Sequence, residues 1–423
     1  MVMRPILLTL FGVASIGLVV ASAGRPSMAA QGASLFSGAV TPMTSPAPEG
    51  SAEPRLTVDA TGRVLLSWLA PKAGGGHSFQ FSELAQNQWA APRTIVEGTR
   101  FFANWADFPS LFVTRGGLMA AHWLERRGPG RTSYDVQLRT SRDNGRTWTE
   151  TVTPHRDGTE TEHGFVSFFE APGKGPNAGL GLVWLDGRGM AGHGDHGAGG
   201  GQMTLRAAMV SAKGTTGEEM LIDGRVCDCC QTAATATDTG VVVAYRDRSD
   251  TEIRDISVSR FENGKWSQGT PAYSDKWEIN GCPVNGPALA AKGQFVVLAW
   301  YTALNNAPKT QLVFSKDGGR TFGAPIRIDS GTTLGRVGLT LLADGRALVS
   351  WIDNIGAASQ FMVRDVKPDG TVGAPVLISP ISGDRTSGFP QVVVSGRRVV
   401  AAWTLVTRGA PTKVSVATAQ LSR

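Results

Sequence analysis

An apolar strand that ends in an aromatic residue recurs seven times along the chain. The aromatic residues are 51 to 61 positions apart and are Trp68, Trp123, Trp184, Tyr245, Trp300, Trp351 and Trp403. A shorter apolar strand and a Gly turn precede each of them, and an alternating strand follows. Most repeats also carry a fourth strand. Four antiparallel strands repeated at this spacing predict the blades of a β-propeller.

The last repeat runs out of sequence after its third strand. Residues 33–42 precede the first complete repeat and can supply the missing strand, which would close the ring and leave no exposed sheet edge. We therefore predict an all-β fold, a single propeller of seven four-stranded blades over residues 31–423. Six blades are the alternative if one repeat is irregular.

The first 30 residues have the features of a secretory signal peptide. Arg4 is followed by an apolar run from Ile6 to Val20 and then by small residues. This order of basic, apolar and small residues predicts export from the cytoplasm and cleavage. An uncleaved membrane anchor is the alternative, because the run is near the lower length limit for a membrane span. We expect a periplasmic or secreted protein.

The composition agrees with an all-β protein and narrows the range of partners that we expect. The chain has 53 Gly, 23 Pro and 11 Trp, which suits many turns and short strands. The net charge is +6, from 41 Lys and Arg against 35 Asp and Glu. The basic residues are scattered without a block or a nucleic-acid-binding motif, so we expect no nucleic-acid partner.

All four cysteines fall at equivalent places in two successive repeats. Cys227, Cys229 and Cys230 precede the inner strand of blade four, and Cys282 precedes that of blade five. If each inner strand runs away from the top face, the loops between blades gather at one mouth, where ligand sites tend to lie. The sequence therefore predicts that these thiols meet at the top face.

Three histidines are expected on the same rim, namely His163, His193 and His196, whereas His155 is expected to be exposed. Thiolate and imidazole are ligands that select copper(I), zinc or iron, and copper is the first choice for a thiolate cluster outside the cytoplasm. Structural disulfides are an alternative, because exported proteins oxidise their thiols and four cysteines allow three pairings. A redox-active thiol pair is a further alternative.

Two turns share one pattern of residues. Ser141-Arg-Asp-Asn-Gly145-Arg-Thr147-Trp148 and Ser315-Lys-Asp-Gly-Gly319-Arg-Thr321-Phe322 link the third and fourth strands of blades two and five. Their Asp and Ser side chains can satisfy backbone groups, and Gly permits a positive φ. These turns, the repeats and the segments 162–166, 226–232, 245–249, 252–256 and 282–287 resemble the sialidase-like superfamily of Asp-box proteins, and exported bacterial proteins named exo-α-sialidases in particular.

That resemblance implies a propeller and, in true sialidases, three arginines that grip a substrate carboxylate, a Tyr nucleophile activated by Glu, and an Asp acid. The residues that could play these roles are Arg246, Arg336 and Arg385 for the clamp, Tyr245 or Tyr301 with Glu278 for the nucleophile pair, and Asp107 for the acid. The chain lacks the Arg-Ile-Pro segment of true sialidases, and Pro54-Arg55-Leu56 is the nearest match.

The sequence thus leaves three functions open. The first is metal binding or thiol redox chemistry at the Cys/His site. The second is hydrolysis of sialic acid or a related acidic carbohydrate. The third is a scaffold without catalytic activity that binds a glycan or a protein.

Overall fold

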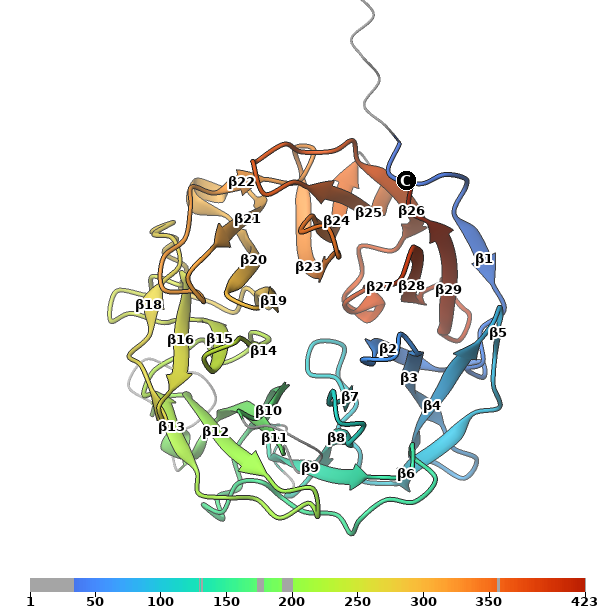
Figure 1. Cartoon of the computed structure of the whole chain (residues 1–423). Helices are drawn as coiled ribbons and strands as arrows, with labels where there is room; N and C mark the ends of the chain where they lie inside the picture. The colour runs from blue at the N-terminus through green and yellow to red at the C-terminus, as the bar shows by residue number, and fades with distance from the viewer. Residues whose placement is uncertain are drawn as a thin grey trace, which may run out of the picture. The chain divides into compact units, whose positions relative to one another are not determined.

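The computed structural model describes residues 34–128, 130, 132–172, 179–191, 201–355 and 358–422. Residues 34–423 make up one compact unit. Its strands form seven antiparallel sheets arranged as blades in a ring, so the predicted seven-bladed propeller is confirmed and the six-bladed alternative is wrong (Figure 1). The predicted signal peptide lies outside the described residues.

The strand nearest the ring axis in each blade is at least partly buried. These inner strands are β2 (Ala52–Val58), β7 (Ser110–Val113), β10 (His163–Glu170), β14 (Ala233–Ala236), β19 (Ala288–Lys292), β23 (Thr333–Leu341) and β27 (Gln391–Ser395). The next strand of each blade is almost fully buried because it packs against both neighbouring blades. These strands are β3 (Val64–Pro71), β8 (Met119–Arg126), β11 (Leu180–Asp186), β15 (Val241–Arg246), β20 (Phe295–Thr302), β24 (Ala347–Ile355) and β28 (Arg398–Leu405).

The third and outer strands complete the blades. The third strands are β4 (His77–Ala85), β9 (Tyr134–Ser141), β12 (Thr204–Val210), β16 (Ile256–Glu262), β21 (Lys309–Ser315), β25 (Ala358–Val366) and β29 (Lys413–Gln420). The outer strands are β5 (Gln88–Trp89), β6 (Arg93–Gly98), β13 (Met220–Asp223), β17 (Lys265–Trp266), β18 (Thr270–Pro271), β22 (Ile326–Arg327) and β26 (Val376–Ile381), with β1 (Thr41–Met43) in blade seven. Blade two has only an isolated bridge from Leu138 to Val152 at this place. The described residues include three short 3-10 helices in loops: η1 (Arg188–Met190), η2 (Leu304–Asn306) and η3 (Arg385–Ser387).

The recurring aromatic residues form the core between blades. Trp68, Trp123, Trp184, Trp300 and Trp351 are completely buried, and Tyr245 and Trp403 are nearly so. An aromatic residue of this size removes a large apolar area from water. The aromatic residue that recurs in the sequence is therefore the residue that packs the core of each blade.

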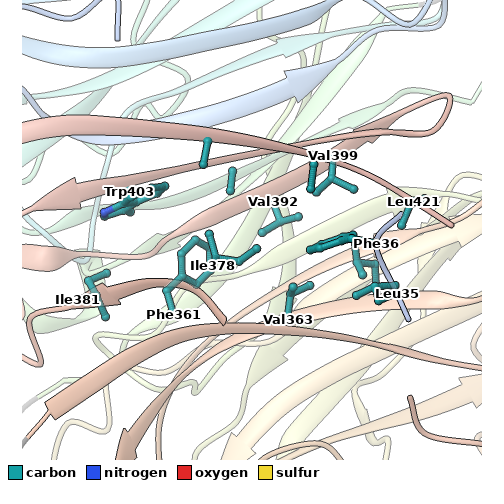
Figure 2. Close-up of a cluster of buried hydrophobic side chains, with 14 of the residues drawn as sticks. Leu35, Phe36, Phe361, Val363, Ile378, Ile381, Val392, Val399, Trp403 and Leu421 are labelled. Atoms are coloured by element: carbon teal, nitrogen blue, oxygen red, sulfur yellow. The ribbon is translucent and has the colours of Figure 1, made fainter. Parts of the chain in front are cut away.

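The ring closes through strands from both ends of the chain. β1 pairs with β29 in blade seven, as predicted for the N-terminal segment. Leu35 and Phe36 extend this contact into the core between blades six and seven, where Phe36 bridges to Leu421 (Figure 2).

The two similar turns have the same hydrogen bonds. In the first, Asp143 Oδ1 accepts from the main-chain N–H groups of Arg146 and Thr147, and Ser141 Oγ accepts from that of Gly145. Ser315 and Asp317 repeat these contacts. Gly145 and Gly319 have φ of 75° and 78°, so glycine is required at this place. The two turns stabilise blade edges.

Candidate functional site

Two loops bring the four cysteines together on the top face. Cys227, Cys229 and Cys230 lie between β13 and β14, and Cys282 lies between β18 and β19. Cys229 and Cys282 form a disulfide whose Cα atoms are 6.0 Å apart, although the residues are 53 positions apart in sequence. The predicted meeting of thiols from successive blades is therefore present in the structure.

The other two cysteines are free thiols beneath this disulfide. Cys227 is 0% exposed and Cys230 is 2% exposed, whereas Cys282 is at the surface and Cys229 is intermediate. The Sγ of Cys227 lies 3.9 Å from the Sγ of Cys229. The site is thus layered, with a disulfide that solvent reaches and a buried dithiol behind it.

The two buried thiols have pKa values shifted in opposite directions. Burial acts to raise the pKa of Cys227, but a hydrogen bond from the Cys230 thiol, the main-chain N–H of Cys229 and the charges of Arg254 and Arg246 lower this pKa to about 7. Burial and the neighbouring Cys227 hold the pKa of Cys230 well above its usual value. Near neutral pH Cys227 is therefore partly ionised, whereas Cys230 stays a thiol.

Arg246 is a structural residue next to this pair. Its guanidinium donates to the main-chain carbonyls of Asn285, Arg254 and Tyr301 at 2.5–2.9 Å and lies over the ring of Trp277. It is 2% exposed. A guanidinium whose donors are engaged in this way ties three loops together and has little left to offer a substrate carboxylate.

Arg336, the second arginine of the expected clamp, is engaged in the same way, whereas Arg385 is free at the surface of its loop. Arg336 is 7% exposed and donates to the carbonyls of Asp384 and Gly388 and to the hydroxyl of Ser387. Arg385 is exposed in η3. The geometry gives no support to a three-arginine clamp.

The expected nucleophile pair is not assembled either. Tyr245 is 1% exposed and donates to Asp223 Oδ2 at 2.6 Å, and its pKa is raised by burial and by Asp223. Tyr301 packs edge-on against Trp277. Glu278 is exposed on its loop. At 1% exposure the Tyr245 phenol is out of reach of a substrate, and burial, which raises its pKa, disfavours the phenolate.

Asp107, the expected acid, is buried in a network of its own. Its Oδ1 accepts from the main-chain N–H of Phe165 at 2.7 Å, and its Oδ2 accepts from the hydroxyl of Tyr134, which also donates to Glu162. Burial is the main reason that the pKa of Asp107 rises to about 8, with Glu162 adding to it. The carboxyl is thus protonated at neutral pH.

His163 joins a different cluster from the one expected. It is completely buried and stacks on His155, which is 4% exposed, so the expectation that His155 is exposed is wrong. Their carboxylate neighbours are Asp135, Asp157 and Asp186. His193 and His196 lie outside the described residues. No described histidine therefore joins the cysteine cluster.

Two amides at the channel mouth escaped the sequence analysis. The Gln231 side chain links the carbonyl of Ala106 to the N–H of Gly286, and Asn285 accepts from the N–H of Arg336. These bonds join the loops of blades two, four, five and six. Both residues flank the cysteines in sequence, which is the only signal that could have pointed to them.

A cavity of about 350 Å³ lies within the ring. Residues of all seven inner strands line it, and most of them are small or apolar. Arg55 and Asp107 are the ionisable residues that line it, and the guanidinium of Arg55 lies 4.4 Å from the centre of the Phe108 ring. Polar side chains such as Ser110, Thr232 and Gln391 lie among the apolar ones, so the lining does not single out one class of ligand.

No protein-family model matches the sequence, and no curated protein matches it significantly. Solved structures do match. A protein of unknown function from Dyadobacter fermentans has a TM-score of 0.54 at 14% identity, covering 90% of this chain and 98% of that chain. The polysaccharide lyase Uly1 has a TM-score of 0.50 at 9% identity, covering 90% and 91%.

A NanB sialidase structure from Streptococcus pneumoniae has a TM-score of 0.44 at 12% identity, covering 92% of this chain and 71% of that chain. Structures similar to this chain thus include sialidases and polysaccharide lyases. At these identities the two matches with TM-scores of 0.54 and 0.50 show a similar fold and nothing of activity, because one fold can host many activities. Among the described residues there is no helix with the length and hydrophobicity that a bilayer crossing requires.

Proposed function

We propose that the cysteine cluster is a thiol–disulfide exchange centre of an exported propeller. The observation that carries this proposal is the 3.9 Å separation between the Sγ atoms of Cys227 and Cys229, the latter already bonded to Cys282. Exchange requires a thiolate next to a disulfide sulfur. Cys227 meets that requirement because its pKa of about 7 makes it partly ionised at neutral pH.

The exchange proceeds in two balanced steps. The Cys227 thiolate attacks Cys229 Sγ, the Cys227–Cys229 bond forms, and Cys282 leaves as a thiolate at the surface. Cys230 then passes its proton to this thiolate and attacks Cys227, which releases Cys229. The disulfide has moved from the exposed pair to the buried pair, and two exposed thiols can reduce a disulfide of a partner protein.

Export makes this chemistry possible. Disulfides persist outside the cytoplasm, where the signal peptide expected at residues 1–30 would direct the chain. The Cys229–Cys282 disulfide is compatible with such a compartment.

Disulfide mapping tests the proposal directly. The purified protein is equilibrated in glutathione buffers of graded potential, quenched with acid, alkylated and digested for mass spectrometry. We expect Cys229–Cys282 to be replaced by Cys227–Cys229 or Cys227–Cys230 over part of the range, and Cys227→Ser to prevent both. Detection of Cys229–Cys282 alone until full reduction would contradict exchange.

Copper(I) binding is a second candidate, favoured by the convergence of three sulfurs. The Sγ atoms of Cys227, Cys229 and Cys230 lie within 4.8 Å of one another. Thiolates are the ligands that copper(I) prefers, and zinc is the alternative ion. Cys229 and Cys282 would have to be reduced first, so the metal and the disulfide exclude each other.

Competition with a copper(I) chelator before and after reduction tests this candidate. We expect no tight binding by the disulfide form and one equivalent bound by the reduced form, with loss in Cys230→Ser. Equal binding by both forms would exclude this ligand set.

The geometry does not support hydrolysis of an acidic carbohydrate, because the guanidinium groups of Arg246 and Arg336 donate to main-chain carbonyls. A carbohydrate ligand on the top face stays a prediction. Saturable binding on a glycan array that survives replacement of all four cysteines by Ser would support it.

A further inference from the structure

Residues 280–284 form a strap in the loop between β18 and β19, and Cys282 lies at the centre of the strap. The first three residues of the strap are exposed and the last two are half-buried. Cys282 forms the disulfide with Cys229, which lies in the loop that precedes β14. The strap thus carries the solvent-exposed half of the disulfide that lies outside the two buried thiols.

Both ends of the strap are anchored by hydrogen bonds. On one side, the main-chain N–H of Ile279 donates to the carbonyl of Glu252 at 3.0 Å. On the other side, the carbonyl of Asn285 accepts from the guanidinium of Arg246 at 2.7 and 2.9 Å, and Asn285 Oδ1 accepts from the N–H of Arg336 at 2.7 Å. Hydrogen bonds from a charged donor are among the strong ones, so these ends stay in place when the centre of the strap moves.

The centre of the strap has no comparable anchor. Within the part of the chain that the structure describes, none of its main-chain N–H groups donates a hydrogen bond, and of its carbonyls only that of Pro283 accepts, from the side chain of Asn285. A Cβ added at Gly281 would meet only the side chain of Ile279, at 4.0 Å. Among the described residues, the disulfide is therefore the one covalent or hydrogen-bonded link from the centre of the strap to another blade.

Val284 holds a backbone conformation that works against the closed strap. Its φ is 46°, in the left-handed region that β-branched residues rarely adopt. Such a conformation persists only where the surrounding structure imposes it. The two constraints on Val284 are the disulfide of Cys282 on one side and the hydrogen bonds of Asn285 on the other. Loss of the disulfide removes one of them, so the backbone at Val284 can relax and move the strap.

The disulfide also lies between solvent and the buried thiols. The Sγ of Cys229 is bonded to Cys282 and lies 3.9 Å from the Sγ of Cys227. Cys227 is 0% exposed and Cys230 is 2% exposed. When Cys282 moves away with the strap, one side of the Cys229 sulfur is uncovered, and Cys227 is the neighbour of that sulfur.

We propose that the strap is a redox-controlled lid on Cys227 and Cys230, which the disulfide holds shut and reduction opens. A reductant of the dithiol class attacks the exposed sulfur of Cys282, and Cys229 leaves as a thiolate. The second thiol of the reductant then displaces Cys282, so that the reductant leaves as its own disulfide and its two protons pass to the two cysteines. The lid rests on the cysteine site of the proposed function, but it needs only reduction of the disulfide and no attack by Cys227.

Alkylation of Cys227 measures the opening of the lid. The full chain is labelled anaerobically with N-ethylmaleimide at neutral pH, and the rate at Cys227 is divided by the thiolate fraction from ultraviolet titration, so that it reports access. We expect labelling at least about 10-fold faster in Cys229→Ser/Cys282→Ser than in the disulfide form, because thiol reactivity follows access. Equal rates would overturn the proposal. Reduced wild type is the control: it keeps all four sulfur atoms, so fast labelling there does not come from a hole left by Ser.

Hydrogen exchange separates a lid from unfolding of the loops. The main-chain N–H groups of Ile279, Gly286 and Arg336 are hydrogen-bonded beside the strap. We expect their exchange rates to change by less than about 3-fold on reduction, because the opening is local. Loss of protection at all three would show that the loops unfold, which would also overturn the lid.

The lid and the proposed exchange fail separately. Slow labelling of Cys227 after reduction overturns the lid alone. Detection of the Cys229–Cys282 bond alone until full reduction overturns exchange alone.

Discussion

Cys227 and Cys229 hold their sulfur atoms 3.9 Å apart even though Cys229 is already bonded to Cys282. The structure therefore contains a thiol and a disulfide within reach of each other and joined by one short loop. The guanidinium of Arg246 and that of Arg254 add positive charge beside them. Cys227 is completely buried, whereas Cys282 is exposed and leaves the disulfide accessible to solvent.

Replacement of Cys282 tests this proximity. In Cys282→Ser, Cys229 loses its partner, and we expect it to pair with Cys227, the nearest sulfur. Counting of free thiols after unfolding should give one, on Cys230. Three free thiols would show that Cys227 does not reach Cys229.

The same variant should be less stable. The native disulfide closes a loop of 53 residues between two blades, whereas a Cys227–Cys229 bond closes almost none. Loss of a long loop closure lowers the free energy of unfolding by roughly 2–4 kcal/mol. Urea unfolding under oxidising conditions measures the loss, with Cys230→Ser as the control that keeps the native bridge.

The thiolate of Cys227 depends on a hydrogen bond from Cys230. Burial opposes ionisation of Cys227, and the Cys230 donor is the largest of the effects that lower its pKa to about 7. We expect Cys230→Ala to raise this pKa, so that thiolate absorbance in the ultraviolet develops at higher pH. Cys230→Ser keeps a donor and should retain most of the lowering. Identical titrations for Ala and Ser would contradict the assignment.

Arg246 should prove structural and Arg385 dispensable. Arg246→Ala leaves the buried carbonyls of Asn285, Arg254 and Tyr301 without their donors. Each unsatisfied buried group costs about 1–3 kcal/mol, so we expect a loss of several kcal/mol. Arg385 is exposed, and Arg385→Ala should change stability by less than about 0.5 kcal/mol. Chemical denaturation of both variants measures the difference, and a stable Arg246→Ala would contradict it.

Asp107 gives stability a defined dependence on pH. Its pKa is raised from 3.8 to about 8, mainly by burial, so the folded protein holds a proton that the unfolded chain releases. The contribution is complete below the unfolded pKa and is lost as pH rises through about 8, because the unfolded chain binds fewer protons in this window.

We therefore expect the unfolding free energy of the wild type to fall between about pH 4 and pH 8 more steeply than that of Asp107→Asn. Asp238→Asn, at an exposed position, is the control and should keep the wild-type slope. Parallel slopes for wild type and Asp107→Asn would show that Asp107 does not titrate in this way.

The fold could be predicted because a buried aromatic residue, which each blade needs for packing, recurs seven times in the sequence. Each blade needs a bulky residue in the second half of its second strand, and residues such as Trp68 and Trp300 mark that place. The closing strand β1 could be anticipated because the last repeat lacked a fourth strand.

The site could be predicted only in part. Topology placed Cys227 and Cys282 on one face, but four cysteines allow three pairings and sequence does not choose among them. The role of Arg246 depends on main-chain carbonyls, which leave no sequence pattern. The exposure expected for His155 is wrong, because its ring stacks on that of His163 and is buried.

The pairing of β1 with β29 has a consequence for biogenesis. A ring sealed by strands near both ends of the polypeptide cannot be finished until residues 413–420 have arrived beside residues 41–43. A chain that passes through an export channel would therefore keep two unpaired strand edges until residues 413–420 emerge. The last step of folding is then the pairing of β1 with β29. Any need for a chaperone should be greatest just before this pairing.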